Sequence, residues 1–95
     1  MSQLFEPFEA KGLRFKNRII HVPTTLNMSD PQGYATRRLA AAYGAIARGG
    51  YAATIVGATC VRRDGLINER MLGLYDEDYV IEFRDTVSEI KNNDS

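Results

Sequence analysis

Residues 18–57, RIIHVPTTLNMSDPQGYATRRLAAAYGAIARGGYAATIVG, hold two short apolar segments separated by a helix-forming segment. The first apolar segment, residues 18–22, is rich in β-branched side chains and stops at Pro23. The second, residues 51–56, stops at Gly57. Such runs are typical of strands that are buried on both faces of a parallel sheet. The stretch therefore predicts a strand–helix–strand unit with a right-handed crossover.

The segment between the two strands has the signals of an amphipathic helix. Thr36 is a good N-cap for a helix over residues 37–48, because its hydroxyl can accept an amide of the first turn. Arg48 lies in the last turn, where a cation suits the helix dipole, and two glycines follow as a break. An apolar stripe at helical spacing runs along one side, formed by Leu39, Tyr43 and Ile46.

Downstream of the second strand we expect a charged loop over residues 58–75 and then another helix over residues 77–91. Asp76 is the expected cap, and with Glu77 and Asp78 it forms a helix-start cluster that the dipole favours. The face expected to pack on the core carries Val80, Phe83, Val87 and Ile90.

Upstream, residues 12–17 alternate apolar and polar side chains and reach a turn-forming Asn, which predicts a short strand or hairpin arm. Pro7 forbids a regular helix through the opening. The order is then arm, strand, helix, strand, helix. A two-stranded parallel unit leaves both edges unpaired, so we expect this α/β unit to be incomplete alone.

The composition excludes some classes of function. The chain has 95 residues, is 44% hydrophobic and 25% charged, and has a formal net charge of zero. This balance gives no general attraction for nucleic acid or for an anionic membrane. No secretory signal or transmembrane run is visible, and a single cysteine cannot form an internal disulfide or a multi-cysteine metal site. We therefore expect a cytoplasmic protein without a metal site.

A series of short motifs resembles the opening of old yellow enzyme-like NAD(P)H:flavin oxidoreductases, a superfamily that includes dienoyl-CoA reductases and trimethylamine dehydrogenase. The motifs follow the family's order and spacing over nearly the whole chain, at residues 4–8 (LFEPF), 12–13 (GL), 16–20 (KNRII), 23–25 (PTT), 33–36 (GYAT), 48–50 (RGG), 58–59 (AT) and 73–76 (GLYD).

The resemblance implies a (β/α)₈ barrel that holds FMN at the carboxyl ends of its strands. A complete barrel needs about 250 residues. The chain is expected to supply an N-terminal arm (1–17), a first β/α unit (18–50) and a second β/α unit (51–95). The arm would lie across the bottom of the barrel, where Asn17 and Arg18 are expected to anchor structure.

The resemblance also implies where FMN would be contacted. Backbone amides of the Pro23, Thr24 and Thr25 segment would lie beside the flavin N5–O4 edge, and so would the Thr25 side chain. The alternative is that the two threonines only cap a strand end. After the second strand, Ala58 would let the flavin O4 edge approach the backbone, although simple turn chemistry also explains it. Many relatives carry Glu where Gly57 stands, so the local polar network is expected to differ.

The other candidate residues are expected to be structural. His21 lies within a strand, where a hydrogen-bonded packing role outweighs acid–base chemistry. Cys60 is expected to be a small buried hydrophobe. Arg62 and Arg63 are expected in a solvated loop, with contact to an anionic substrate as the alternative. No catalytic residue is assigned, because the family's proton donor and its phosphate site lie later in the barrel.

The function implied is that of a small subunit of a split flavoprotein. A partner protein would carry the rest of the barrel, and hydride would pass from NAD(P)H or another donor through the shared FMN to an activated alkene. The alternatives are a non-catalytic assembly or capping module, or a truncated fragment of such an enzyme. The small-molecule substrate and the electron donor are not determined by these residues.

Overall fold

The computed structural model describes residues 2–66 and 70–95. Met1 and residues 67–69 lie outside the described residues, the latter within the loop expected over 58–75. The elements follow the chain in the order α1, β1, β2, β3, α2, β4, β5, η1, β6, α3.

The arm is a hairpin, as predicted. Strands β1 (Phe8–Ala10) and β2 (Leu13–Phe15) pair antiparallel, with Phe8 opposite Phe15. The expectation about the opening was too strict, because one helical turn, α1 (Ser2–Phe5), precedes the hairpin. This turn ends before Pro7, since a proline disfavours helical geometry in the residue that precedes it.

The predicted strand–helix–strand unit is confirmed. Strands β3 (Ile20–His21) and β4 (Ala53–Thr54) are parallel, with Ile20 aligned to Ala53. Between them lies α2 (Arg37–Arg48), and the Thr36 hydroxyl accepts the amide of Leu39 at 3.1 Å, as the capping signal predicted. Gly50 follows with φ of 107°, a value that favours glycine, so the helix ends where the sequence indicated.

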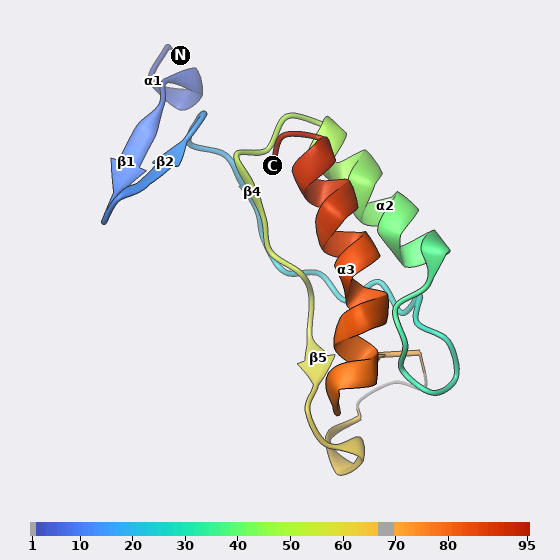
Figure 1. Cartoon of the computed structure of the whole chain (residues 1–95). Helices are drawn as coiled ribbons and strands as arrows, with labels where there is room; N and C mark the ends of the chain where they lie inside the picture. The colour runs from blue at the N-terminus through green and yellow to red at the C-terminus, as the bar shows by residue number, and fades with distance from the viewer. Residues whose placement is uncertain (1, 67–69) are drawn as a thin grey trace.

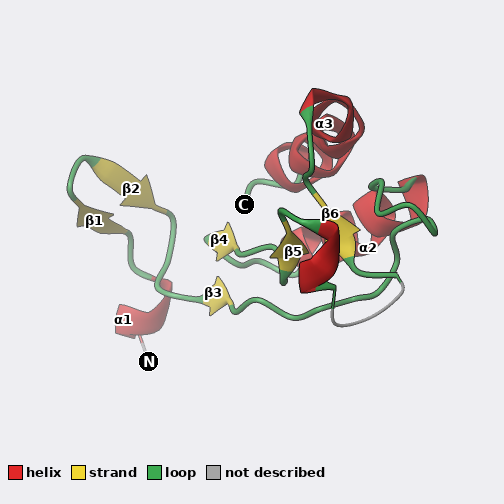
Figure 2. Ribbon diagram, turned by 90° about the horizontal axis from the view of Figure 1, so that it is seen from below, coloured by secondary structure: helices red, strands yellow, loops and turns green. Residues whose placement is uncertain are grey.

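The core lies between α2 and α3 (Glu77–Asn92). The two helices lie side by side, on one side of the strands, while the hairpin stands apart from them (Figures 1 and 2). Asp76 caps α3 by accepting the amide of Asp78, so the acidic helix-start cluster is confirmed. The buried cluster consists of Ala35, Leu39, Tyr43, Ala47, Leu72 and Ile90.

The apolar face predicted for α3 is only half right. Phe83 and Ile90 do pack on the core. Val80 and Val87 are 45% and 41% exposed, whereas Tyr79 and Thr86 are buried. The packed stripe is therefore rotated around the helix, because α2 covers only one side of α3.

Within this chain only one face of the β3–β4 strands is buried, because a two-stranded unit leaves much of its apolar surface uncovered. Alternation along a strand puts Ile20 and Val22 on one face of the small sheet. Their exposed fractions are 46% and 66%, and Ile55 on the neighbouring segment is 47% exposed. Val56 points the other way and packs against the helical core. One face of the sheet is thus covered by the helices and the opposite face is bare.

The segment after β4 has more structure than the loop predicted for residues 58–75. Strands β5 (Thr59–Cys60) and β6 (Leu72–Gly73) pair in parallel, and a 3₁₀ turn, η1 (Arg63–Gly65), lies between them in the chain. Such two-residue pairings have no strong sequence signal. The pairing is defined by backbone hydrogen bonds between residues far apart in the sequence, such as the bond from Leu74 N to Cys60 O at 2.8 Å.

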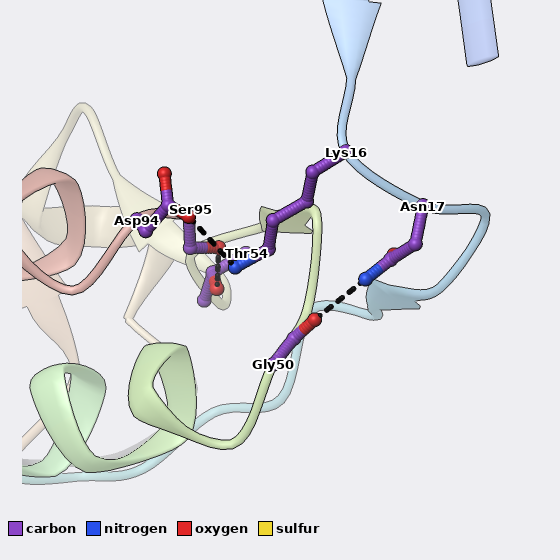
Figure 3. Close-up of polar contacts among 6 residues, drawn as sticks. All are labelled: Lys16, Asn17, Gly50, Thr54, Asp94 and Ser95. Carbon is purple, nitrogen blue, oxygen red and sulfur yellow. Dashed lines mark hydrogen bonds and ion pairs between the residues drawn. The ribbon is translucent and has the colours of Figure 1, made fainter. Parts of the chain in front are cut away.

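A small set of polar contacts ties the arm and the end of α3 to the β4 region (Figure 3). Asn17 donates to the Gly50 carbonyl at 2.8 Å and accepts the amide of Ile19 at 2.9 Å, which confirms its structural role. Lys16 pairs with Asp94 at 3.5 Å, and the hydroxyls of Thr54 and Ser95 lie 2.8 Å apart.

Arg18 also anchors the arm. Its amide donates to the Leu4 carbonyl at 3.0 Å, and its guanidinium lies 5.2 Å from the centre of the Phe8 ring. Both contacts stay within the arm and the strand that follows it, so the role expected of Arg18 as a structural anchor is confirmed.

Over the described ranges, 2–66 and 70–95, we find no helix with the length and apolar character needed to cross a membrane.

Candidate functional site

Two loops leave the carboxyl ends of β3 and β4. The first loop covers residues 22–36, and the second, which starts at residue 55, contains β5, η1 and β6. Because β3 and β4 are parallel, the two loops start at the same edge of the sheet. In α/β proteins ligands bind outside the carboxyl ends of the strands, so this edge is the candidate site.

The residues predicted to contact a cofactor all lie exposed at this edge: Pro23, Thr24, Thr25 and Ala58. The Thr24 hydroxyl donates back to the Val22 carbonyl at 3.4 Å, which favours the strand-cap interpretation for that side chain. The Thr25 hydroxyl is exposed and is not engaged by another residue of the described ranges. Thr25 is therefore the side chain of this pair that is available to a ligand.

Gly57 brings the two loops into direct contact. A Cβ added at Gly57 would collide with the Thr24 carbonyl and would lie 3.0 Å from the Thr25 Cα. The neighbouring atoms belong to the backbone, so they cannot move aside as a flexible side chain would. With the two loops as close as they are in this structure, a side chain at position 57 would require them to move apart, and glycine requires no such shift.

The Tyr43 side chain of α2 binds the backbone amide of Gly57. Its hydroxyl accepts the Gly57 amide at 2.9 Å, although the residue as a whole is only 2% exposed. The Thr59 hydroxyl donates to the Gly57 carbonyl at 3.0 Å. Sequence reasoning placed Tyr43 only in an apolar stripe. The missed signal was its hydroxyl, which needs a partner when a tyrosine is buried.

A cavity of about 10 Å³ lies between the loops and α2, and Thr25, Tyr43, Gly57 and Ala58 are among its lining residues. This volume has room for about one water molecule. A larger ligand would therefore lie over the exposed edge rather than inside the chain.

The first loop is held by its own polar side chains. Ser29 is 4% exposed, and its hydroxyl lies 2.6 Å from the Arg70 carbonyl and 3.0 Å from the Met71 carbonyl. The Asp30 carboxylate accepts the amides of Gln32 and Tyr34, each at 2.9 Å. This turn, which Asp favours through such local bonds, fixes the loop before a ligand arrives.

The far ends of the two loops meet in a cluster of tyrosines around Arg63. The Arg63 guanidinium lies 4.7 Å from the Tyr75 ring centre and donates to the Tyr79 hydroxyl at 2.9 Å. That hydroxyl donates to the Gln32 carbonyl at 3.0 Å, and the Tyr34 ring stacks on Tyr79 at 4.0 Å. Arg63 is exposed, as a solvated loop predicts, and its guanidinium also contacts these tyrosines. Arg62 is exposed and pairs with Asp64 at 3.3 Å, as a solvated loop predicts.

The surroundings raise the pKa of two tyrosines in this cluster. Desolvation, followed by the neighbouring Tyr79, Asp78 of α3 and its N-cap Asp76, raises the pKa of Tyr34 above 10.0. Burial and then the adjacent Cys60 thiol raise the pKa of Tyr75 above 10.0.

His21 and Cys60 do not contribute to the site. Cys60 is 5% exposed and its thiol donates to the Arg62 carbonyl at 2.6 Å, so its role as a small buried residue is confirmed. His21 packs edge-on against Tyr51, with ring centres 5.2 Å apart. The hydrogen bond expected for it is not found, because its Nδ1 atom is buried without a partner within the described residues.

The geometry fits contact with one edge of a flavin ring. The two loops contact each other at Gly57. They present exposed backbone, the Thr25 hydroxyl and the small Ala58 side chain at this edge. The cavity at this edge is about 10 Å³, which is too small to surround such a ring. These residues therefore suit one side of a cofactor site rather than a whole site.

Comparison with known proteins shows which family the sequence matches. The model of the NADH:flavin oxidoreductase / NADH oxidase family matches residues 3–95. The NADPH dehydrogenase of Bacillus cytotoxicus is 33% identical over 95 residues, which is 99% of this chain and 28% of that protein. That of Listeria welshimeri is 36% identical over 81 residues, 84% of this chain and 24% of that protein. The chain thus spans about a quarter of the length of these curated relatives.

Solved structures share the fold. A 2-naphthoyl-CoA reductase in complex with 2-naphthoyl-CoA superposes with a TM-score of 0.94 at 19% identity, covering 99% of this chain and 14% of that chain. An old yellow enzyme from Pichia sp. superposes with a TM-score of 0.83 at 22% identity, covering 98% of this chain and 24% of that chain. At these identities the likeness establishes the α/β fold, and the family assignment rests on the sequence match. The chain therefore belongs to the NADH:flavin oxidoreductase / NADH oxidase family.

Proposed function

We propose that this chain is the small subunit of a split, old yellow enzyme-like flavin oxidoreductase. It would contribute the arm and the first two β/α units of a (β/α)₈ barrel, and a partner chain would contribute the remaining units. The assembled cytoplasmic enzyme would pass hydride from NAD(P)H through a shared FMN to an activated alkene.

The observation that carries this proposal is the contrast between the two faces of the β3–β4 sheet. The helices cover one face, whereas Ile20, Val22 and Ile55 on the opposite face are 46%, 66% and 47% exposed. Burial of one such side chain is worth about 1.5–3 kcal/mol. In a barrel of this kind the inward faces of the strands form a packed core, so a partner barrel segment supplies the missing cover.

The chemistry at the site follows from the loops. FMN, when bound, supplies hydride transfer. Within this chain, backbone around Pro23 and Thr24 and the Thr25 hydroxyl would hold the N5–O4 edge, while Ala58 would leave room for the ring. A hydroxyl donor at Thr25 would stabilise negative charge at that edge, and so would raise the flavin potential.

Thr25→Ala is expected to lower the flavin potential and to leave assembly intact. Loss of a hydrogen bond to a charged group costs about 1.5–3 kcal/mol. For a two-electron couple 30 mV corresponds to about 1.4 kcal/mol, so the expected decrease is roughly 30–60 mV. Spectroelectrochemical titration of the assembled complex measures it. Thr25→Ser keeps the hydroxyl and is expected to keep the potential. An equal potential in all three proteins would remove Thr25 from the site.

Isolation of the tagged chain from its native cells tests the assignment directly. The expected product is a yellow complex that contains FMN and a second polypeptide with the missing β/α units. A colourless product, or the chain without a second polypeptide, would contradict the proposal.

Experiments with purified proteins need a defined substitute for the partner. We use the name complement for the Bacillus cytotoxicus NADPH dehydrogenase from which the segment matched by this chain has been removed.

A further inference from the structure

Tyr43 occupies an unusual place in this fold, because it joins the helical core to the cofactor-facing edge. It is buried in α2 with 2% of its surface exposed, and its ring belongs to the core cluster. Its hydroxyl accepts the Gly57 amide at 2.9 Å, at the start of the second loop. A core residue thus binds the Val56–Gly57 peptide, one residue before Ala58.

The position of that peptide affects both loops. Gly57 lies so close to the first loop that an added Cβ would collide with the Thr24 carbonyl. A shift of the Gly57 peptide would therefore move Ala58 and would also change the space beside Thr25. The hydroxyl of Tyr43 keeps one proton to donate, and the adjacent cavity of about 10 Å³ has room for about one water molecule.

We infer that Tyr43 is a positioning residue: its hydroxyl holds the Gly57 peptide, and through it the spacing between Thr25 and Ala58, at the distance that the flavin edge requires. This inference rests on the proposed function for its ligand, but the hydrogen bond itself belongs to the chain alone. Tyr43 touches no reacting atom in this scheme and acts only through Gly57.

The chain offers a matched control for removal of a hydroxyl. Tyr75 also has a buried hydroxyl, but that hydroxyl makes no hydrogen bond within the described residues. Tyr43→Phe and Tyr75→Phe remove the same atom and keep the same ring. Only the first removes an acceptor from a backbone amide of the second loop.

The experiment uses the chain assembled with the complement and FMN, in wild-type, Tyr43→Phe and Tyr75→Phe forms. Hydrogen exchange at the Gly57 amide is expected to become about tenfold faster in Tyr43→Phe, the factor expected from loss of one ordinary hydrogen bond. The FMN dissociation constant is expected to rise about tenfold in the same variant, since small misplacements of binding groups have large effects. Tyr75→Phe is expected to change neither quantity.

The outcomes separate this inference from the proposed function. If the wild-type chain forms no flavin complex, the proposed function fails and the inference falls with it. If the wild-type complex forms but Tyr43→Phe matches Tyr75→Phe in both measurements, the inference alone is overturned. Faster exchange at Gly57 with unchanged FMN affinity overturns it too, because the bond is then only structural. A Tyr43→Phe chain that does not assemble would make the hydroxyl a folding group and would also overturn it.

Discussion

Mixing the chain with the complement is expected to convert negligible FMN binding into tight binding. The chain by itself offers exposed groups at one edge of the ring and a cavity of about 10 Å³, so it can bury little of the cofactor. Ligand sites of this size class bury most of their ligand in about 300–1,000 Å³. The phosphate also needs backbone amides or cationic groups, which the later loops of such barrels supply.

The titration follows quenching of FMN fluorescence by the chain, by the complement and by an equimolar mixture. The complement alone is expected to bind weakly, because it holds the phosphate site without the first two strands. The mixture is expected to bind tightly, because closing the barrel orders both halves around the ring. Tight binding by the chain alone would show that the cofactor site has been misplaced. A mixture no better than the complement would count against barrel completion.

The isolated chain is expected to lack a cooperative unfolding transition. Many of its large apolar side chains are exposed, and Val61 is 73% exposed. Both strands of the β3–β4 sheet have an unpaired edge. Its radius of gyration is 14.5 Å, whereas a compact domain of this length has about 12 Å. Too little apolar surface is removed from water to offset the conformational entropy lost on ordering.

Thermal unfolding followed by circular dichroism, together with amide exchange, tests this expectation. We expect a broad transition and weak protection at β3 and β4 in the isolated chain. Addition of the complement should give a single sharp transition and strong protection at the same amides. A sharp, concentration-independent transition of the purified monomer would show that the α2–α3 core is sufficient for folding.

Local signals in the sequence predicted the helices well. Helix α2 begins after Thr36 and ends at Arg48, as its cap and glycine break indicated. Helix α3 begins after Asp76 for the same reason. Caps and breaks act within one turn of the helix, so the identity of a few neighbouring residues is sufficient to predict them.

Contacts between distant segments were not predicted. The bond from the Tyr43 hydroxyl to the Gly57 amide and the bond from Arg63 to Tyr79 each join residues on separate elements. The packed stripe of α3 was misplaced for the same reason, because the neighbour that covers a helix decides which of its apolar residues are buried. Whether Pro23, Thr24, Thr25 and Ala58 contact a cofactor stays a prediction.

The amino-acid sequence by itself determined the hairpin arm, the ends of the two long helices, the parallel strand–helix–strand unit and, through its short motifs, the family. These properties depend on local backbone preferences and on side-chain periodicity along the chain. Only the tertiary structure decided that one face of the sheet is bare, that Gly57 brings the two loops into contact, and that the Tyr43 hydroxyl binds the Gly57 amide. Those properties depend on distances between residues far apart in the sequence, which exist only once the helices have packed.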